Sequence, residues 1–379
     1  MKVLVLGGYG NFGAIIAETL AREASFEVVV AGRDGARARE FAARIGATGA
    51  RIDTGDANFA ASVRTLQPAL IIATAGPFQG QDYRVARAAL ACAAHYFDIA
   101  DARAFVCGIG ALDAQARAAG RLVVSGASSV PGLSSAVVER LAAQFASMET
   151  IDIGISASQK TPGLATVGSV LSYCGKPFSR WREAEWTVVH GWQHARRHAF
   201  THARLRRWLA ECDVSDLQLL PEKHGSLRDV RFSAGVELAA VQWGLGALAW
   251  MVRARWLKSA AAHARPLAAA SRFLEKFGSG RSAMFLRVAG RGRDGQPLER
   301  TWELHAREGA GIRVPCMAVV ALARKLDRGE LPPAGAMPCI GLLTLEEYLA
   351  ELDGGLITTH GADGARGPAE LAGQLPFPL

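Results

Sequence analysis

Short apolar runs alternate with alanine-rich, amphipathic stretches in the N-terminal third of the chain. Residues 3–6, 27–31, 69–78, 95–100 and 121–128 each contain the short apolar run of a buried strand, and residues 49–56 contain a shorter strand that ends near Asp53. The stretches between them, such as residues 35–45, have the composition of helices. Strands that alternate with helices predict an α/β fold, with a doubly wound parallel sheet and right-handed crossovers.

The pattern changes after Ser134. Residues 149–158 predict a strand, and residues 282–308 predict two antiparallel strands joined at Asp294-Gly295. Helical patterning returns from residue 309, and the chain from Gly361 onward is rich in Gly, Pro and Ala. We therefore expect a doubly wound domain at residues 1–133, an inserted α+β domain at 134–310, and C-terminal helices with a loose tail at 311–379.

Composition and charge narrow the function classes. Half of the residues are hydrophobic, and the six cysteines lie far apart without a C-x-x-C pair, which gives no zinc cage or disulfide framework. Because the chain opens on a strand without a signal-peptide pattern, we expect a cytoplasmic protein. The net charge of +8 is concentrated between Arg180 and Arg293, where no nucleic-acid motif occurs. We expect no nucleic-acid partner; anionic lipid, an anionic substrate or solubility would each explain the charge.

The opening run KVLVLGGYGNFG combines a strand, a glycine-rich turn and the start of a helix. Gly8, Gly10 and Gly13 satisfy G-x-G-x-x-G. In that pattern the first glycine permits a tight turn, the second lets the backbone approach a pyrophosphate, and the third lets the helix pack on the strand. Free N–H groups at the start of the helix would face the phosphates. The strand and helix around this run predict a dinucleotide-binding loop.

The end of the second strand bears on the choice of cofactor. An acidic residue there usually holds the ribose hydroxyls of NAD, but this chain has Gly32 and Arg33 followed by Asp34. Arg33 can form charge-assisted hydrogen bonds with the 2′-phosphate of NADP, so we expect NADP. Asp34 keeps NAD open as the alternative, because a shift of one or two residues would restore an NAD-type acid.

Four stretches together resemble the saccharopine dehydrogenase/reductase-like family of oxidoreductases: residues 3–13, 31–34, 74–101 and 119–138. The resemblance extends from the start of the chain to about Arg140, and residues 301–326 resemble the closing region of the family more loosely. It implies a Rossmann domain completed by returning C-terminal helices. It also implies that the inserted domain contributes substrate contacts and a homodimer interface.

The resemblance also implies roles for individual residues. By position, the cofactor would contact Gly8, Gly10, Asn11, Phe12, Gly13, Arg33, Asp53, Ala75, Gly76, Pro77 and Phe78. Saccharopine reductases carry an Asp before the Pro-Gly of the sixth strand region, where this chain has Val130, so a carboxylate suited to proton transfer with an amine or imine is missing. Among the remaining polar groups, Asp98, Asp101, Ser128 and Ser129, we favour Asp101 and then Ser129 as catalytic candidates. Asp101 has the alternative role of capping the helix after it.

Two further stretches have patterns that can indicate a function, a row of histidines and an apolar window. His190, His194, His198 and His202 lie four residues apart and would form one stripe on a helix, but arginines lie among them and no Cys or carboxylate accompanies them. We expect a solvated helix face and no metal site. Residues 233–259 are the most apolar window, whose uncharged core is too short for a membrane span. A helix that is buried against protein or that forms a dimer contact is the expectation, with peripheral contact to anionic lipid as the alternative.

We therefore predict an NADP(H)-dependent oxidoreductase that transfers a hydride to or from a small substrate bound between its two domains. A dinucleotide-binding sensor or assembly protein without turnover is the first alternative, supported by Val130. A membrane-associated reductase of a lipid-like substrate is the second, supported by residues 233–259.

Overall fold

The computed structural model describes residues 1–159, 164–352 and 354–361 of the chain. These residues divide into two compact units. The first comprises residues 1–133 and 312–343, and the second comprises residues 134–311 together with the chain from Thr344 onward. The loose tail expected after Gly361 lies outside the described residues.

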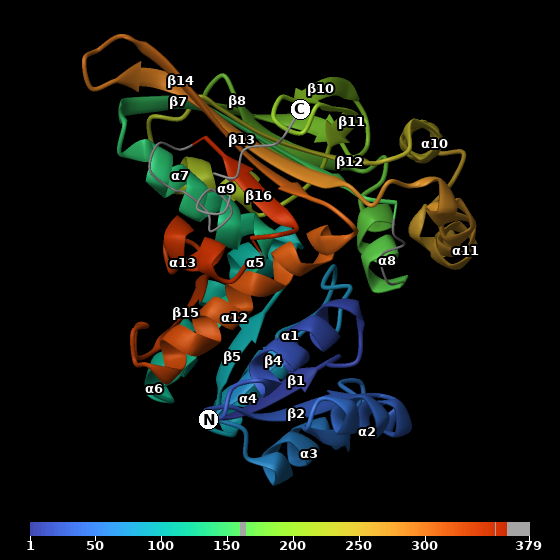
Figure 1. Cartoon of the computed structure of the whole chain (residues 1–379), viewed down its shortest axis with the longest axis vertical. Helices are drawn as coiled ribbons and strands as arrows, with labels where there is room; N and C mark the ends of the chain where they lie inside the picture. Colours follow the sequence, from blue (N-terminus) through green and yellow to red (C-terminus); the bar gives the residue numbers. More distant parts are fainter. Residues whose placement is uncertain (160–163, 353, 362–379) are drawn as a thin grey trace, which may run out of the picture. The chain divides into compact units, whose positions relative to one another are not determined.

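The first unit is built on a seven-stranded parallel sheet with the order β15-β6-β5-β4-β1-β2-β3 (Figure 1). Its strands are β1 Lys2–Leu6, β2 Glu27–Gly32, β3 Thr48–Arg51, β4 Leu70–Ala73, β5 His95–Asp98, β6 Leu122–Ser125 and β15 Gly335–Pro338. The strand order reverses between β1 and β4, and in doubly wound sheets ligands bind beyond the strand ends at such a reversal. The expected α/β fold, a doubly wound parallel sheet with a second domain, is confirmed.

Helices cover the first sheet because its inner strands, such as β1, β4 and β6, are apolar and buried on both faces. They are α1 Asn11–Ala21, α2 Gly35–Arg44, α3 Phe59–Leu66, α4 Arg84–Ala91, α5 Arg103–Cys107, α6 Asp113–Ala118 and α12 Val314–Asp327. Leu4 and Leu6 of β1 join a core cluster with Val63 of α3 and Ala89 of α4. Side chains alternate along a strand, so Val3 and Val5, which are also fully buried, point to the opposite face.

The first unit is completed by a segment from far along the chain. The C-terminal helix α12 packs against α1, and the guanidinium of Arg324 forms an ion pair with Glu23. After α12, strand β15 pairs in parallel with β6, with Gly335 opposite Leu122.

The second unit is built on a seven-stranded mixed sheet with the order β10-β11-β12-β7-β13-β14-β16. Its strands are β7 Phe145–Ala157, β10 Arg196–Phe200, β11 Leu205–Glu211, β12 Asp229–Val236, β13 Ser282–Gly292, β14 Pro297–Ala306 and β16 Ile357–His360. Strands β13 and β14 form the expected hairpin, in which Gly295 has a φ of +76°. The pairing of β7 with β12 is parallel, and the other pairings are antiparallel.

Helices and a separate hairpin complete the second unit. The helices are α7 Ser134–Ala142, α8 Leu164–Ser172, α9 Asp216–Lys223, α10 Ala239–Arg253, α11 Ala264–Leu274 and α13 Leu345–Ala350, and the hairpin is formed by β8 Pro177–Arg182 and β9 Glu185–His190. The position of α13 and β16 differs from the expected return of all C-terminal elements to the first domain. The backbone of β16 pairs with the edge strand β14, which draws this last segment to the second sheet.

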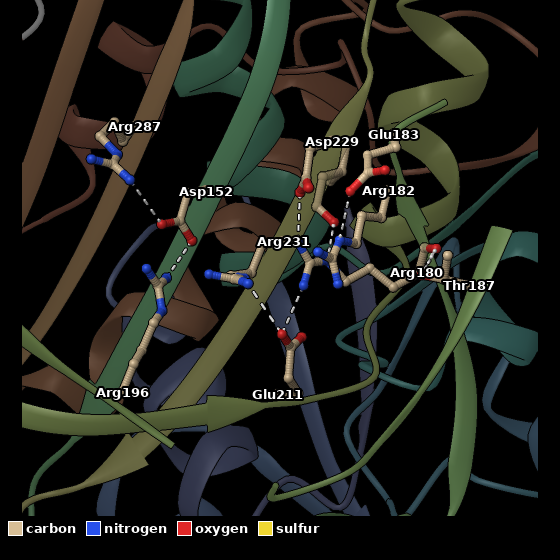
Figure 2. A network of polar contacts seen from close by, with 11 residues as sticks. Asp152, Arg180, Arg182, Glu183, Thr187, Arg196, Glu211, Asp229, Arg231 and Arg287 are labelled. Atoms are coloured by element: carbon tan, nitrogen blue, oxygen red, sulfur yellow. Dashed lines mark hydrogen bonds and ion pairs between the residues drawn. The ribbon is translucent and has the colours of Figure 1, made fainter. Parts of the chain in front are cut away.

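Many arginines of the basic middle region pair with carboxylates across the second sheet (Figure 2). Arg180 is buried and donates hydrogen bonds to Glu211 at 2.9 Å and Asp229 at 2.6 Å. Asp152 of β7 forms ion pairs with Arg196 of β10 and Arg287 of β13. Part of the net positive charge is therefore used inside the fold.

The structure corrects two predictions about local elements. The four histidines do not lie on a helix: His190 ends β9, His194 lies in the following turn, His198 belongs to β10, and His202 follows that strand. Residues 196–200 pair with β11 and alternate in exposure, as a strand does. Among the described residues no group of three or more His, Cys, Asp or Glu side chains is arranged to hold a metal.

The apolar window at 233–259 is also different from the prediction. Its first residues belong to β12, and the helix α10 spans only Ala239–Arg253. Of this helix only Gln242 and Ala249 are buried, so the same chain does not bury it as expected. Burial in a contact between two copies stays a prediction. No helix within the described ranges is long and apolar enough to cross a membrane.

Candidate functional site

The turn between β1 and α1 is a tight backbone loop that only glycine can form at two positions. Gly7 has a φ of +79°, and its N–H, like that of Gly8, donates to the carbonyl oxygen of Ala31 at the end of β2. A Cβ on Gly13 would lie 2.2 Å from the Gly7 oxygen, so the helix can approach the strand only if Gly13 lacks a side chain. The predicted motif assigned the turn to Gly8, whereas the left-handed residue is Gly7. In the sequence, the two consecutive glycines Gly7 and Gly8 were the signal that could have indicated this turn.

The beginning of α1 is open to an anion. Gly10 is the N-cap residue, and no side chain of the described residues caps the helix there. The first turn, which starts at Asn11, contains no acidic residue. The free N–H groups at Asn11, Phe12 and Gly13 and the positive end of the helix dipole together form an anion-binding site. This geometry is suited to the pyrophosphate of a dinucleotide.

At the end of β2 the two candidate residues differ in what they contact. The Asp34 carboxylate accepts hydrogen bonds from the N–H groups of Ala36 and Arg37, at 3.0 and 3.1 Å, and so caps α2. Arg33 is exposed and makes no hydrogen bond or ion pair with any residue that the structure describes. The acid is therefore used in the fold, while the guanidinium of Arg33 is available for an anionic ligand.

Tyr9 connects the glycine-rich turn to the end of β2. Its hydroxyl accepts a hydrogen bond of 2.9 Å from the Asp34 N–H, and the Arg37 guanidinium lies 5.1 Å from the centre of its ring. A Cβ on Gly32 would lie 2.4 Å from the same ring. Arg37 is thus a second cation beside the loop, which the sequence prediction did not include.

The loop after β3 carries Asp53, whose carboxylate is half-buried and accepts a hydrogen bond from the N–H of Gly55 at 3.0 Å. This bond shapes the turn that follows β3. The predicted role of Asp53 at the adenine stays a prediction.

The loop after β4 carries Ala75, Gly76, Pro77 and Phe78. The Gly76–Pro77 peptide bond is cis, and the Gln81 side chain donates to the carbonyl oxygens of Ala75 and Pro77, at 3.1 and 2.6 Å. Phe78 is buried, whereas Ala75 and Pro77 are exposed. A small pocket lies at the ends of β1, β4 and β5, and its lining includes Leu6, Ala73, Ala75, Phe78, Tyr96 and Phe105.

Asp101 lies beside this loop. It is half-buried and accepts a hydrogen bond from the Gln79 side chain at 3.2 Å, which connects the segment after β5 to the segment after β4. The N-cap position of α5 belongs to the next residue, Ala102. Asp101 therefore contacts Gln79 at the strand ends, and it does not occupy the N-cap position of α5 that the alternative interpretation gave it.

The other polar candidates follow β6. Ser128 is buried, and Ser129 is half-buried at the start of a short helical turn, Ser129–Leu133. Val130 is buried and precedes a cis peptide bond to Pro131. The structure therefore has an apolar side chain where the family pattern has a carboxylate.

Asp98 is the residue that the prediction undervalued. It is fully buried at the end of β5, and its Oδ1 accepts hydrogen bonds from the N–H groups of Ala100 and Gly126 and from the Ser125 hydroxyl. These donors favour the ionised carboxylate, but burial outweighs them and raises the pKa of Asp98 to about 6. The carboxyl group connects the ends of β5 and β6 and fixes the segment that leads to Ser128.

A family of known proteins matches the part of the chain that contains these strand ends. Residues 3–124 match the family model described as the saccharopine dehydrogenase NADP binding domain. No curated protein is similar enough in sequence to count as a relative.

Solved structures that cover both units of the chain have a similar fold. The chain is similar to apo saccharopine dehydrogenase (L-Glu forming) from Saccharomyces cerevisiae, with a TM-score of 0.67 and 14% identity over 95% of this chain and 99% of that one. It is also similar to a homospermidine synthase from Legionella pneumophila in complex with NAD, with a TM-score of 0.61 and 10% identity over 100% and 95% of the two chains. At these identities the likeness establishes the fold alone.

The family match, the open N-terminus of α1 and the glycine cradle, by which we mean the turn at Gly7, Gly8 and Gly13, agree with one another, and together they support an NAD(P)-dependent oxidoreductase. Residues 3–124 of this chain are thus similar to the saccharopine dehydrogenase NADP-binding domain family, as the sequence resemblance indicates.

Proposed function

We propose that this protein is an NADP(H)-dependent oxidoreductase that acts on a small carbonyl or imine compound, or on the corresponding alcohol or amine. The observation that carries the proposal is the contrast at the end of β2. Asp34 is used as a helix cap, while Arg33 has no partner among the described residues and stands beside the glycine cradle. That arrangement supports a cofactor with a 2′-phosphate over one without it.

The residues present are suited to the cofactor. The N–H groups at the start of α1 would hold the pyrophosphate, with Arg33 and Arg37 beside the adenosine phosphate. The loop from Ala75 to Phe78, held by Gln81, would border the nicotinamide. When bound, the nicotinamide supplies the hydride chemistry.

The protein would orient the substrate and handle a proton. Hydride transfer to a carbonyl or imine carbon leaves an oxygen or nitrogen that must gain a proton, and oxidation must remove one. Asp101 is our candidate for that exchange, because its carboxylate is held by Gln79 next to the loop that borders the nicotinamide. Ser129 is the candidate for orienting the substrate through its hydroxyl.

A binding protein without turnover is the second candidate function. It is favoured by Val130, which puts a buried apolar side chain where saccharopine reductases have an acid. Such a protein would bind NADP through the same loop and would signal its presence to a partner.

Turnover and binding measurements distinguish these functions. We expect NADPH to bind in calorimetric titration and to be oxidised, as followed by its absorbance, with at least one member of a panel of small aldehydes, ketones and imines. Asp101→Asn should lower kcat with little change in NADPH affinity, and Glu40→Gln on the exposed side of α2 is the control. Tight NADPH binding without turnover in either direction would favour the sensor. Absence of NADP binding would refute both functions.

A further inference from the structure

Large apolar side chains are exposed mainly in one segment of the second unit. Within the described residues, eight large hydrophobic side chains are exposed, and six of them lie between residues 239 and 277. We call these six the α10–α11 surface: Trp243, Trp250, Trp256, Leu267, Phe273 and Phe277. Trp256 is 74% exposed and Phe273 is 66% exposed. Figure 1 shows both helices at one end of the second sheet.

The outward side of α10 lacks the polar residues of an ordinary surface helix. Its exposed positions are Ala239, Ala240, Trp243, Gly244, Ala247, Trp250 and Arg253, so the only charge is in its last residue. The polar Gln242 instead faces inward and accepts a hydrogen bond from the Val236 N–H at 3.0 Å. A water-facing helix normally has the opposite pattern. The outward face of α10 is therefore suited to an apolar neighbour.

Cations surround this apolar surface. From residue 239 to residue 277 the chain has six Lys or Arg residues and one acid, Glu275. Arg253 ends α10, Arg255 and Lys258 follow it, and all three are exposed. After the other helix, the Lys276 ammonium lies 4.2 Å from the Phe273 ring centre and 5.1 Å from that of Phe277. Exposed aromatic rings among cations are typical of helices that lie in the interface of an anionic bilayer.

The charges also argue against other occupants. A twofold contact through this surface would bring two cation-rich copies of it together, and like charges in an interface cost affinity. A membrane span is excluded for α10, since it has 15 residues where about 20 are needed. A bilayer surface provides both an apolar layer for the rings and anionic headgroups for the cations.

We propose that the α10–α11 surface docks the protein peripherally on membranes that contain anionic lipid. The tryptophan and phenylalanine rings enter the headgroup boundary, where aromatic rings are favoured, and the arginines and lysines contact lipid phosphates. The docking depends on this surface alone and not on the proposed redox function. It assigns a partner to α10, which the sequence pattern predicted to be buried and which the described residues leave largely exposed.

Vesicle flotation tests the proposal with the full-length protein. Vesicles made from two parts of phosphatidylcholine and one part of phosphatidylglycerol should carry the protein upward in a density gradient, and pure phosphatidylcholine vesicles should carry much less. The double variant Trp250→Ala/Trp256→Ala should lose at least about tenfold in partition coefficient. Arg255→Gln/Lys258→Gln should lose roughly thirtyfold at low salt.

Matched controls separate the surface from general effects. Trp186→Ala removes another exposed tryptophan outside the surface, and Arg44→Gln/Arg64→Gln removes two exposed cations of the first unit. Both should float like the wild type. Circular dichroism and NADPH titration of each variant check its fold. Failure of the wild type to float, or equal flotation of surface and control variants, would overturn the proposal. So would a dimer in light scattering that Trp250→Ala/Trp256→Ala converts to monomer, because the surface would then belong to a second copy.

Discussion

Replacing Arg33 with alanine tests the cofactor assignment at its most specific point. Arg33 is exposed, has no partner among the described residues, and follows the last residue of β2. Asp34 next to it already accepts two backbone N–H bonds as the cap of α2. The substitution therefore removes a cation available to the 2′-phosphate and leaves the described contacts of the fold intact.

The size of the effect follows from this environment. A hydrogen bond to a charged group contributes about 1.5–3 kcal/mol. Because Arg33 is exposed, solvent and salt screen its charge, and we expect the lower end of that range. Arg37, which stays above the Tyr9 ring, keeps part of the positive potential. Since about 1.4 kcal/mol is a factor of ten, Arg33→Ala should weaken NADPH binding about tenfold.

Calorimetric titration with NADPH and NADH measures both affinities. NADH lacks the phosphate, so its affinity should stay within about twofold of the wild type. Arg44→Ala, in the last turn of the helix that follows Arg33, is the control and should change neither affinity. Raising the salt concentration should weaken NADPH more in the wild type than in the variant. Equal losses for the two cofactors would show that Arg33 acts only on the structure, and tighter NADH than NADPH in the wild type would refute the assignment.

Four further predictions concern the glycine-rich turn, Asp98 and the second sheet. Gly13→Ala should lower the free energy of unfolding by about 1–3 kcal/mol in urea titrations, because its Cβ would lie 2.2 Å from the carbonyl oxygen of Gly7. Gly10→Val should keep the fold but weaken the binding of NADPH in calorimetric titration, and an undiminished affinity would contradict the assignment of the glycine-rich turn to the cofactor. The pKa of Asp98 is about 6 in the fold and about 3.8 when unfolded, so the contribution of this group to stability is greatest below pH 4 and falls by about 3 kcal/mol as the pH rises through 6. Asp98→Asn should abolish this fall in urea unfolding at several pH values, and an unchanged pH profile would refute it. Arg180→Leu should cost about 3–5 kcal/mol by the same method, because it leaves the buried Glu211 with less compensation, and Arg180→Leu/Glu211→Leu should recover part of that loss.

The sequence predicted most where the signal is local. The strand, turn and helix at residues 2–21 lie next to each other in the chain, so apolar periodicity and glycine spacing determine them. The four histidines show the limit of periodicity. A spacing of four residues gives a stripe on a helix but also puts side chains on one face of a strand. The segment around His198 forms a strand because it pairs with β11, a contact that the spacing does not reveal.

The misjudged parts of the candidate site depend on contacts between distant residues. Asp98 ends an apolar strand, but its full burial requires donors from Ser125 and Gly126, which strand order alone brings close. Arg37 lies beside the glycine-rich turn because its guanidinium packs on the ring of Tyr9, whose hydroxyl accepts a hydrogen bond from the backbone segment that follows β2. The apolar window predicted burial of α10 because hydropathy records the preference of a side chain and not whether the same chain covers it.

The strand β15 has a consequence for the synthesis of the protein. It supplies the seventh strand of the first sheet, yet its partner β6 ends at Ser125 and leaves the ribosome long before Gly335 is added. At bacterial or eukaryotic elongation rates this is a delay of roughly 10–40 s. During that time the nascent chain presents β6 as an open edge, a template for wrong pairing. Proteolysis of ribosome-bound chains of increasing length should show full protection of β6 only after β15 has emerged, so the edge at β6 stays open until β15 is made.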